Sequence, residues 1–265
     1  ATGADEIALC DLAREMGYDG IEFVDIVGDD VPARAAAIRE HCASIGLSII
    51  AYTVGANFLA EDLPAEVARV KQCVDVAAAL GAPVMRHDAC WGFADRVHGR
   101  TWRDAVARIA APIREVAEYA ASLGVRTCTE NHGFFIQDSD RVEALIRAVD
   151  HPNYGWLVDM GNFLCADEDC LHAVTTAAPY AVHVHAKDFL LKPGDCIDPG
   201  EGWFRSRGGN HLRGTVVGHG VVPVPQCIAL LQAAGYDGWL SLEFEGHEDN
   251  LPALRRGLAY LKRFA

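Results

Sequence analysis

Residues 125–130 read VRTCTE, a short run rich in β-forming residues that ends in a carboxylate. Three later runs have the same form, namely YGWLVD at 154–159, AVHVH at 181–185 and WLSLE at 239–243. Each run follows a segment with a helical pattern, as a buried parallel strand follows its crossover helix. The sequence therefore predicts four parallel strands that end in Glu130, Asp159, His185 and Glu243.

Strand and helix patterns alternate along the rest of the chain as well. The repeated order predicts a parallel sheet with helical crossovers. A chain of 265 residues is long enough for one α/β barrel or for two small domains. We expect a single (β/α)8 TIM-barrel domain over residues 1–265. The further strands of this barrel are predicted at 20–26, 47–54 and 83–88.

The count of predicted strands is seven, because the sequence opens on a helical pattern. An eight-stranded barrel would need its first strand upstream of Ala1, unless the barrel is built differently, and we favour the missing first strand. The carboxyl ends of barrel strands open on one face, so the four terminal side chains should converge there. Three carboxylates and one imidazole suit one divalent metal ion, and among such oxygen-rich sites we favour Mn²⁺ over Mg²⁺, Co²⁺ or Zn²⁺.

The composition restricts the partners of the protein. Asp and Glu number 37 against 23 Lys and Arg, and the resulting net charge of −14 disfavours a nucleic-acid partner. No run approaches the roughly 18 consecutive apolar residues that a membrane span requires. The nine cysteines include no CxxC pair, which is typical of reduced, structural thiols in a cytoplasmic protein.

Several motifs resemble those of a known family. They are GYDGIEF at 17–23, ENHG at 130–133, DMGN at 159–162, HVHAKD at 183–188 and GYDGWLSLEFEG at 235–246. Together they are similar to the sugar phosphate isomerase/epimerase group of the xylose isomerase-like TIM barrels, over essentially the whole chain. The resemblance implies one divalent metal held by Glu130, Asp159, His185 and Glu243. It also implies that the two glutamates act as acid and base on opposite faces of the substrate.

The predicted reaction is isomerisation or epimerisation of a sugar, sugar acid or sugar phosphate through a metal-stabilised enediolate. The alternative is a lyase of the same superfamily, either a dehydratase or a 3-oxo sugar acid decarboxylase. Two features favour this alternative. One is a set of arginines in the long loop over residues 186–224, and the other is the presence of Asn162 and Ile136 where ketose 3-epimerases carry a histidine and a glutamate that help to hold the ketose. DNA repair of the endonuclease IV type is a third and weaker hypothesis, since the acidic charge does not suit it.

Other polar side chains near the strand ends are candidates for contacts with a small carbohydrate substrate. The candidates that lie close to the predicted metal ligands, either in sequence or at the end of another strand, are Arg86, His87, His132, Asn162 and Lys187. Strand ends are where barrels contact their substrates. His132 could equally bond a neighbouring loop, and Lys187 could equally form a structural salt bridge. A homo-oligomer is a further expectation for such a barrel.

One connection, over residues 186–224, is far longer than the roughly 2–6 residues usual after a barrel strand. It contains Arg205, Arg207 and Arg213. If these arginines point into the mouth of the barrel, they would bind a carboxylate or phosphate of an anionic substrate bidentately. Otherwise they pair with the acidic surface of the protein. We expect at least one of the three to contact an anionic substrate group.

Overall fold

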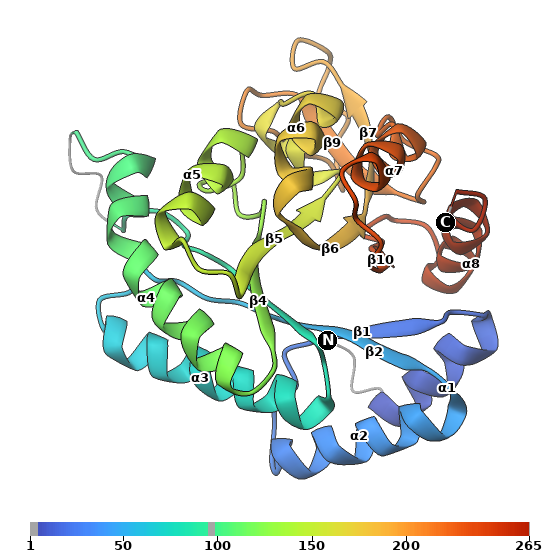
Figure 1. Ribbon diagram of the computed structural model, residues 1–265. Coiled ribbons are helices and arrows are strands. Elements are labelled where there is room, and N and C mark those ends of the chain that lie inside the picture. The colour runs from blue at the N-terminus through green and yellow to red at the C-terminus, as the bar shows by residue number, and fades with distance from the viewer. Residues whose placement is uncertain (1–4, 95–98, 265) are drawn as a thin grey trace.

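The computed structural model of the chain describes residues 5–94 and 99–264. One parallel sheet follows the order β1-β2-β3-β4-β5-β6-β10, and Figure 1 shows it curving into a barrel with the helices outside. The predicted TIM barrel is therefore confirmed, and the described residues contain seven barrel strands, as predicted. The strands are β1 (Gly20–Val24), β2 (Ser48–Val54), β3 (Val84–His87), β4 (Arg126–Glu130), β5 (Tyr154–Asp159), β6 (Ala181–Ala186) and β10 (Leu240–Leu242).

The helices form where capping residues and apolar faces coincide. In α3, the Asp62 carboxylate accepts a hydrogen bond from the Ala65 N–H, and Gly81 ends the helix in the left-handed conformation. The α-helices are α1 (Glu6–Met16), α2 (Val31–Ile45), α3 (Leu63–Leu80), α4 (Trp102–Ser122), α5 (Ser139–Val149), α6 (Cys170–Ala177), α7 (Val224–Ala233) and α8 (Asn250–Leu261). Two short 3₁₀ helices are η1 (Asn162–Ala166) and η2 (Ala178–Tyr180). No helix in the described ranges is long and apolar enough to cross a membrane.

The interior of the barrel is arranged in layers. Four neighbouring strands contribute one apolar cluster, made of Ala51, Val84, Cys128 and Leu157. Side chains two residues further along a strand point to the same face. The next layer therefore lies two positions closer to the carboxyl ends of these strands, and it is polar: Thr53, Arg86, Glu130 and Asp159. The period of two thus places the acidic side chains inside the barrel, above an apolar floor.

The sheet is open between β1 and β10, which do not pair with each other. In the described part of the chain no strand lies between them, and Figure 1 shows α1 on one side of this seam and α8 on the other. A cavity of about 900 Å³ runs from the polar layer into the seam, where Ile21, Leu240 and Leu258 line it. The upstream first strand remains a prediction.

The long connection after β6 folds into a small antiparallel sheet, which the sequence analysis did not predict. It consists of β7 (Asp188–Lys192), β8 (Phe204–Arg205) and β9 (His211–Thr215), in the order β7-β9-β8. The buried Asp188 carboxylate anchors it, because it accepts hydrogen bonds from the backbone N–H groups of Gly218, Gly220 and Val222. Strands as short as β8 leave no periodic pattern in a sequence.

Candidate metal centre

Four side chains from separate strands meet at the carboxyl end of the barrel. Glu130 and Asp159 are the last residues of β4 and β5, His185 lies on β6, and Glu243 follows β10 directly. Each offers one ligand atom, and these atoms all lie within 4.8 Å of one another. The Cα atoms of Asp159 and His185 are paired across the two strands, and the Glu243 N–H bonds the carbonyl of Ala186. The structure thus brings together the four residues that the sequence analysis grouped.

The chemistry of Asp159 fits a cation at this centre. Its Oδ1 accepts hydrogen bonds from the N–H groups of Gly161 (2.7 Å) and Asn162 (2.9 Å). Its Oδ2 is buried and has no hydrogen-bond partner among the described residues, and the Nζ of Lys187 is 3.6 Å away. A buried carboxylate oxygen without a donor is costly unless a cation binds it. The cluster could therefore bind a divalent metal through its three carboxylates and one imidazole.

Two buried cations partly balance the negative charge of the cluster. The Nζ of Lys187 lies 2.9 Å from Glu243 and 3.0 Å from Glu245. Burial, and after it repulsion from Glu243 and Glu130, raises the pKa of Asp159 to about 7, against the attraction of Lys187. Burial also disfavours the charged form of Glu243, but the hydrogen bond from His185 and the Lys187 ammonium hold its pKa below the ordinary value. Of these two carboxyl groups, Asp159 is therefore the one that binds a proton more readily in the metal-free site.

The second buried cation is Arg86. Its guanidinium lies 2.8 Å from Glu130 and 2.7 Å from Asp88, and Asp88 in turn bonds the Nδ1 of His132 at 2.9 Å. The hydrogen bond to Asp88 raises the pKa of His132, whose side chain is half exposed and lines the cavity. Asn162 donates from Nδ2 to Glu130 over 2.8 Å. Arg86, His132 and Asn162 thus surround Glu130, as candidates for substrate contacts should.

His87 lies outside the group of side chains that surround Glu130. Because Arg86 points into the barrel, its neighbour His87 points outward, where it packs between Phe58 and Tyr154 with ring centroids 5.3 and 5.9 Å away. Burial lowers the pKa of His87 to about 4, so the ring is neutral. The structure does not bring His87 to the cavity, and we leave it out of the proposed substrate site.

The three arginines of the long connection are engaged in local contacts. Arg207 pairs with Asp138 and donates to the carbonyl of Phe134, while Arg205 donates to the carbonyl of Gly209. The guanidinium of Arg213 lies 5.4 Å from the centroid of the Trp203 ring. Only the contact of Arg207 with Asp138 matches the alternative in which the arginines pair with the acidic surface, because Arg205 bonds a carbonyl and Arg213 lies over an aromatic ring. The expected contact of one of them with an anionic substrate stays a prediction without structural support.

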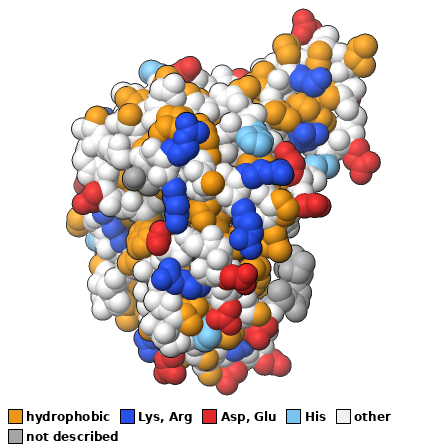
Figure 2. Space-filling view, turned by 90° about the vertical axis from the view of Figure 1, so that its right-hand side faces the viewer, with side chains coloured by type: hydrophobic (Ala, Val, Ile, Leu, Met, Phe, Trp, Pro, Cys, Tyr) orange, Lys and Arg blue, Asp and Glu red, His pale blue; other side chains and the backbone are white. Residues whose placement is uncertain are grey.

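The surface carries charges of both signs. On the face drawn in Figure 2, Lys and Arg side chains are separated by hydrophobic and neutral ones, and acidic side chains gather toward the lower edge. The described side chains of this face form no continuous basic surface. That the protein binds no nucleic acid stays a prediction, which is based on the net charge of −14.

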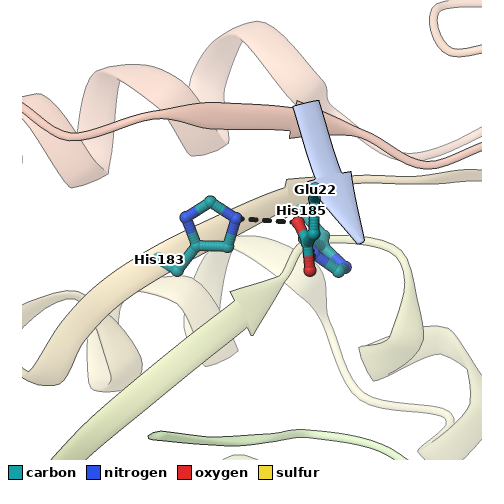
Figure 3. A group of neighbouring side chains, drawn as sticks. All are labelled: Glu22, His183 and His185. Atoms are coloured by element: carbon teal, nitrogen blue, oxygen red, sulfur yellow. Dashed lines mark hydrogen bonds and ion pairs between the residues drawn. The ribbon is translucent and has the colours of Figure 1, made fainter. Parts of the chain in front are cut away.

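Glu22 is a residue of the site that the sequence analysis did not single out. It lies on β1 and faces His183 and His185, as Figure 3 shows, with Nε2 of each ring 3.0 Å from its Oε2. The signal was present in the sequence, because Glu22 is a carboxylate inside the apolar strand GIEFV. An ionised side chain in such a run is costly unless it is paired, so its position pointed to buried partners.

Comparison with known proteins agrees with this architecture. The family model described as xylose isomerase-like TIM barrel matches residues 10–264. The chain is 27% identical over 246 residues to the rhizopine catabolism protein MocC of Rhizobium meliloti, which covers 88% of this chain and 72% of that protein. It is 27% identical over 134 residues to the inosose dehydratase of Geobacillus thermodenitrificans, which covers 50% of this chain and 45% of that enzyme.

Solved structures of similar fold include both epimerases and dehydratases. A xylose isomerase-like TIM-barrel protein from Mycobacterium smegmatis, in complex with magnesium, has a TM-score of 0.73 at 20% identity, covering 99% of this chain and 89% of that one. D-psicose 3-epimerase has a TM-score of 0.74 at 18% identity, with coverages of 99% and 94%. The probable 3-DHS dehydratase AsbF of Bacillus anthracis has a TM-score of 0.75 at 18% identity, with coverages of 98% and 94%. Likeness at these identities concerns the fold.

Proposed function

We propose, from the premise that the chain belongs to the xylose isomerase-like TIM-barrel family, that it is a divalent-metal-dependent isomerase or epimerase of a small carbohydrate. The proposed ligands are Glu130, Asp159, His185 and Glu243. The observation that carries the proposal is the buried Oδ2 of Asp159, which accepts no hydrogen bond from the described residues and lies beside three other side chains of a type that can hold a metal ion. Such an arrangement is costly in an empty barrel and favourable around a cation.

The reaction that this site suits is proton transfer next to a carbonyl group. A divalent ion, when bound, supplies the positive charge that stabilises an enediolate. Glu130 and Glu243 come from different strands and can face opposite sides of a bound sugar, so one can remove the proton and the other can return it. Glu130 is oriented by Arg86 and Asn162, and Glu243 is oriented by Lys187 and His185. Both carboxylates are thus held in place by hydrogen bonds before a substrate arrives.

The substrate contacts are proposed for the polar side chains around the two glutamates. Lys187 is buried and can donate to a substrate oxygen that becomes negatively charged. His132 faces the cavity and can donate to a hydroxyl group. The local contacts of Arg205, Arg207 and Arg213 favour an uncharged sugar over a phosphate ester. We therefore propose a free sugar or polyol ketone as the substrate class.

We propose Mn²⁺ as the bound metal and the cytoplasm as the location of the protein. Mn²⁺ is favoured among Mg²⁺, Co²⁺ and Zn²⁺ because the donors are mainly carboxylate oxygens. The similar barrel from Mycobacterium smegmatis is in complex with magnesium, which supports the proposal that this chain also binds a divalent ion. A cytoplasmic location is consistent with the nine cysteines, all of which are free thiols. We also propose that the protein assembles into a homo-oligomer.

Dehydration is the second candidate function. Asn162 occupies the position of a ketose-binding histidine of the epimerases, and inosose dehydratases are among the similar curated proteins. The raised pKa of His132 makes this side chain a suitable acid for a departing hydroxyl group. The same enolate would then lose a β-hydroxyl instead of regaining its proton.

The deciding experiment follows the mass of the substrate in D₂O. Protein loaded with Mn²⁺ is incubated with ketoses, inososes and 3-oxo sugar acids, and the products are analysed by mass spectrometry. One incorporated deuterium without loss of mass supports the isomerase or epimerase, whereas loss of water or of carbon dioxide supports the lyase. The matched control is Asp159→Asn, which keeps the shape of the side chain and should be inactive. Equal activity of this variant would contradict the metal centre.

A further inference from the structure

Glu22 is the centre of a buried hydrogen-bond network beneath the metal centre. Its carboxylate accepts hydrogen bonds from His183 and His185 on β6, from Ser241 on β10 over 2.7 Å, and from Thr53 on β2. The side chain of Glu22 is 11% exposed, and that of His183 is 1% exposed. A carboxylate in this setting is stable only because its lone pairs are occupied by donors.

The two nitrogens of His185 have different surroundings. Nε2 lies 3.0 and 3.2 Å from the two oxygens of Glu22, whereas Nδ1 lies 2.9 Å from Glu243 and faces the four-residue cluster. Both nitrogens thus face a carboxylate, but only Glu243 belongs to the four-residue cluster, so Nδ1 is the nitrogen that faces this cluster. A cation bound by the cluster would replace the hydrogen bond between Nδ1 and Glu243, while Nε2 would keep its hydrogen bond to Glu22.

We propose that Glu22 is the positioning residue that holds His185 with Nδ1 directed at the metal centre, and that its bond to Ser241 ties this orientation to the position of β10 across the open seam. The inference rests on the proposed function, because it assigns a role toward the metal that the four ligands would bind. Glu22 touches neither the metal nor the substrate in this role. It acts through His185.

The bond between Glu22 and Ser241 joins the two strands that border the seam. β1 and β10 do not pair through their backbones, so this side-chain hydrogen bond connects them at the level of the metal centre. His183 supports the arrangement, since it also lies 3.3 Å from Ser241 and packs edge to face against His185. A displacement of β10 would therefore move Glu22 and, with it, the ring of His185.

An alternative role for Glu22, His183 and His185 is a second metal site, because their donor atoms also lie within 4.8 Å of one another. The hydrogen bonds argue against it. Glu22 already accepts from Ser241 and Thr53 in addition to the two rings. The Oδ2 of Asp159, in contrast, has no such partner among the described residues. A metal ion would thus satisfy an oxygen that lacks a hydrogen bond at the four-residue cluster, whereas at Glu22 it would only replace existing hydrogen bonds.

The test compares metal binding by the wild-type protein and by Glu22→Gln, which keeps the size of the side chain but removes its charge. Calorimetric titration with Mn²⁺ alone should give one site in both, with an affinity about 10- to 100-fold weaker in the variant. Glu22→Asp keeps the carboxylate and should recover part of the affinity. The matched control is Glu168→Gln, because Glu168 is a partly buried carboxylate that bonds Ser139 and belongs to neither of the two clusters of potential metal ligands. It should bind Mn²⁺ like the wild type.

A second measurement reports on His185 directly and does not depend on activity. With Zn²⁺ bound and histidine labelled with ¹⁵N, the wild type should show a protected Nε2–H proton that is bonded to Glu22. This signal should be lost or shifted upfield in Glu22→Gln while the metal-free variant still unfolds cooperatively. A variant that fails to fold is replaced by Glu22→Asp in the same comparison.

The outcomes separate this inference from the proposed function. If the wild type and Glu168→Gln bind no divalent metal, the proposed function is wrong and the inference falls with it. If both bind Mn²⁺ and Glu22→Gln binds it equally tightly with an unchanged His185 signal, the inference alone is overturned. Two bound ions in the wild type, of which Glu22→Gln loses one, would make Glu22 a ligand and would also overturn it.

Discussion

Asn131, at the end of the neighbouring strand, holds the backbone of Asp159 with two hydrogen bonds. Its Nδ2 donates to the carbonyl of Asp159 over 2.8 Å, and its Oδ1 accepts from the N–H of Asp159 over 3.0 Å. The indole Nε1 of Trp156 also donates to this Oδ1, over 3.2 Å. One buried amide therefore replaces the strand hydrogen bonds that end at this point, and it sets how far Asp159 reaches into the centre.

Replacement of this amide should weaken both the fold and the metal site. In Asn131→Asp the donor to the Asp159 carbonyl becomes an acceptor, so a buried carbonyl loses its partner. We expect the free energy of unfolding to fall by about 1–3 kcal/mol, measured by urea denaturation. Binding of Mn²⁺ should weaken in the same variant. An unchanged free energy of unfolding would contradict the structural role of the Asn131 side chain.

Metal binding should stabilise the protein in a way that depends on Asp159. At a free Mn²⁺ concentration of 100 times Kd, we expect about 2.7 kcal/mol of added stability, visible as a rise in Tm. Asp159→Asn removes the charged Oδ2 and should show no such rise. Because the charge repulsion is also removed, the metal-free variant should be no less stable than the wild type. A rise in Tm equal to that of the wild type would refute the assignment of Asp159 as a ligand.

Lys187 should be needed for both stability and rate. Its ammonium is buried among Asp159, Glu243 and Glu245, so Lys187→Met leaves carboxylates without a cation. Breaking a buried pair in this way costs about 3–5 kcal/mol, to be measured on the metal-free protein. With metal bound, we expect kcat to fall by roughly 10²-fold, since a positioned donor to the substrate oxygen is lost. A variant with lower stability and normal kcat would restrict Lys187 to a structural role.

His87 should make the protein sensitive to acid. The unfolded chain binds a proton on this ring near pH 6.5, whereas burial holds the pKa in the folded protein at about 4. The unfolded state therefore binds more protons between these values, and the unfolding free energy falls as the pH drops through this window. The contribution is about 3 kcal/mol in total. Between pH 7 and 4, the unfolding free energy of His87→Gln should fall less than that of the wild type. The control is His172→Gln, on the exposed face of α6, whose unfolding free energy should change with pH as in the wild type.

Substitution of Arg207 tests whether the substrate is an uncharged sugar or an anionic one. Its side chain is 30% exposed and pairs with Asp138, so Arg207→Ala should cost at most about 1 kcal/mol of unfolding free energy. The guanidinium of Arg207 already bonds Asp138 and the carbonyl of Phe134. For this reason the substitution should not change kcat/KM for an uncharged sugar. A large rise in KM for a sugar acid or sugar phosphate in this variant would instead restore the anionic substrate that the sequence suggested.

The four proposed ligands could be predicted from the sequence because parallel strands share one direction. Each of Glu130, Asp159, His185 and Glu243 ends an apolar run, and in a barrel such ends must meet. The choice between Arg86 and His87 could not be predicted in the same way. Both end one strand, and only the register of that strand decides which of two successive side chains points inward.

The sequence by itself determined the fold, the strand ends and the donor set, because these follow from local periodicity and chain direction. The tertiary structure alone decided which side chains touch. It directed the loop arginines to Asp138, Gly209 and Trp203, and it brought Glu22 of the first described strand to His185 and Ser241 near the other end of the chain. The physical reason is that closure of a barrel joins residues that are distant in sequence, and no local pattern records such a contact.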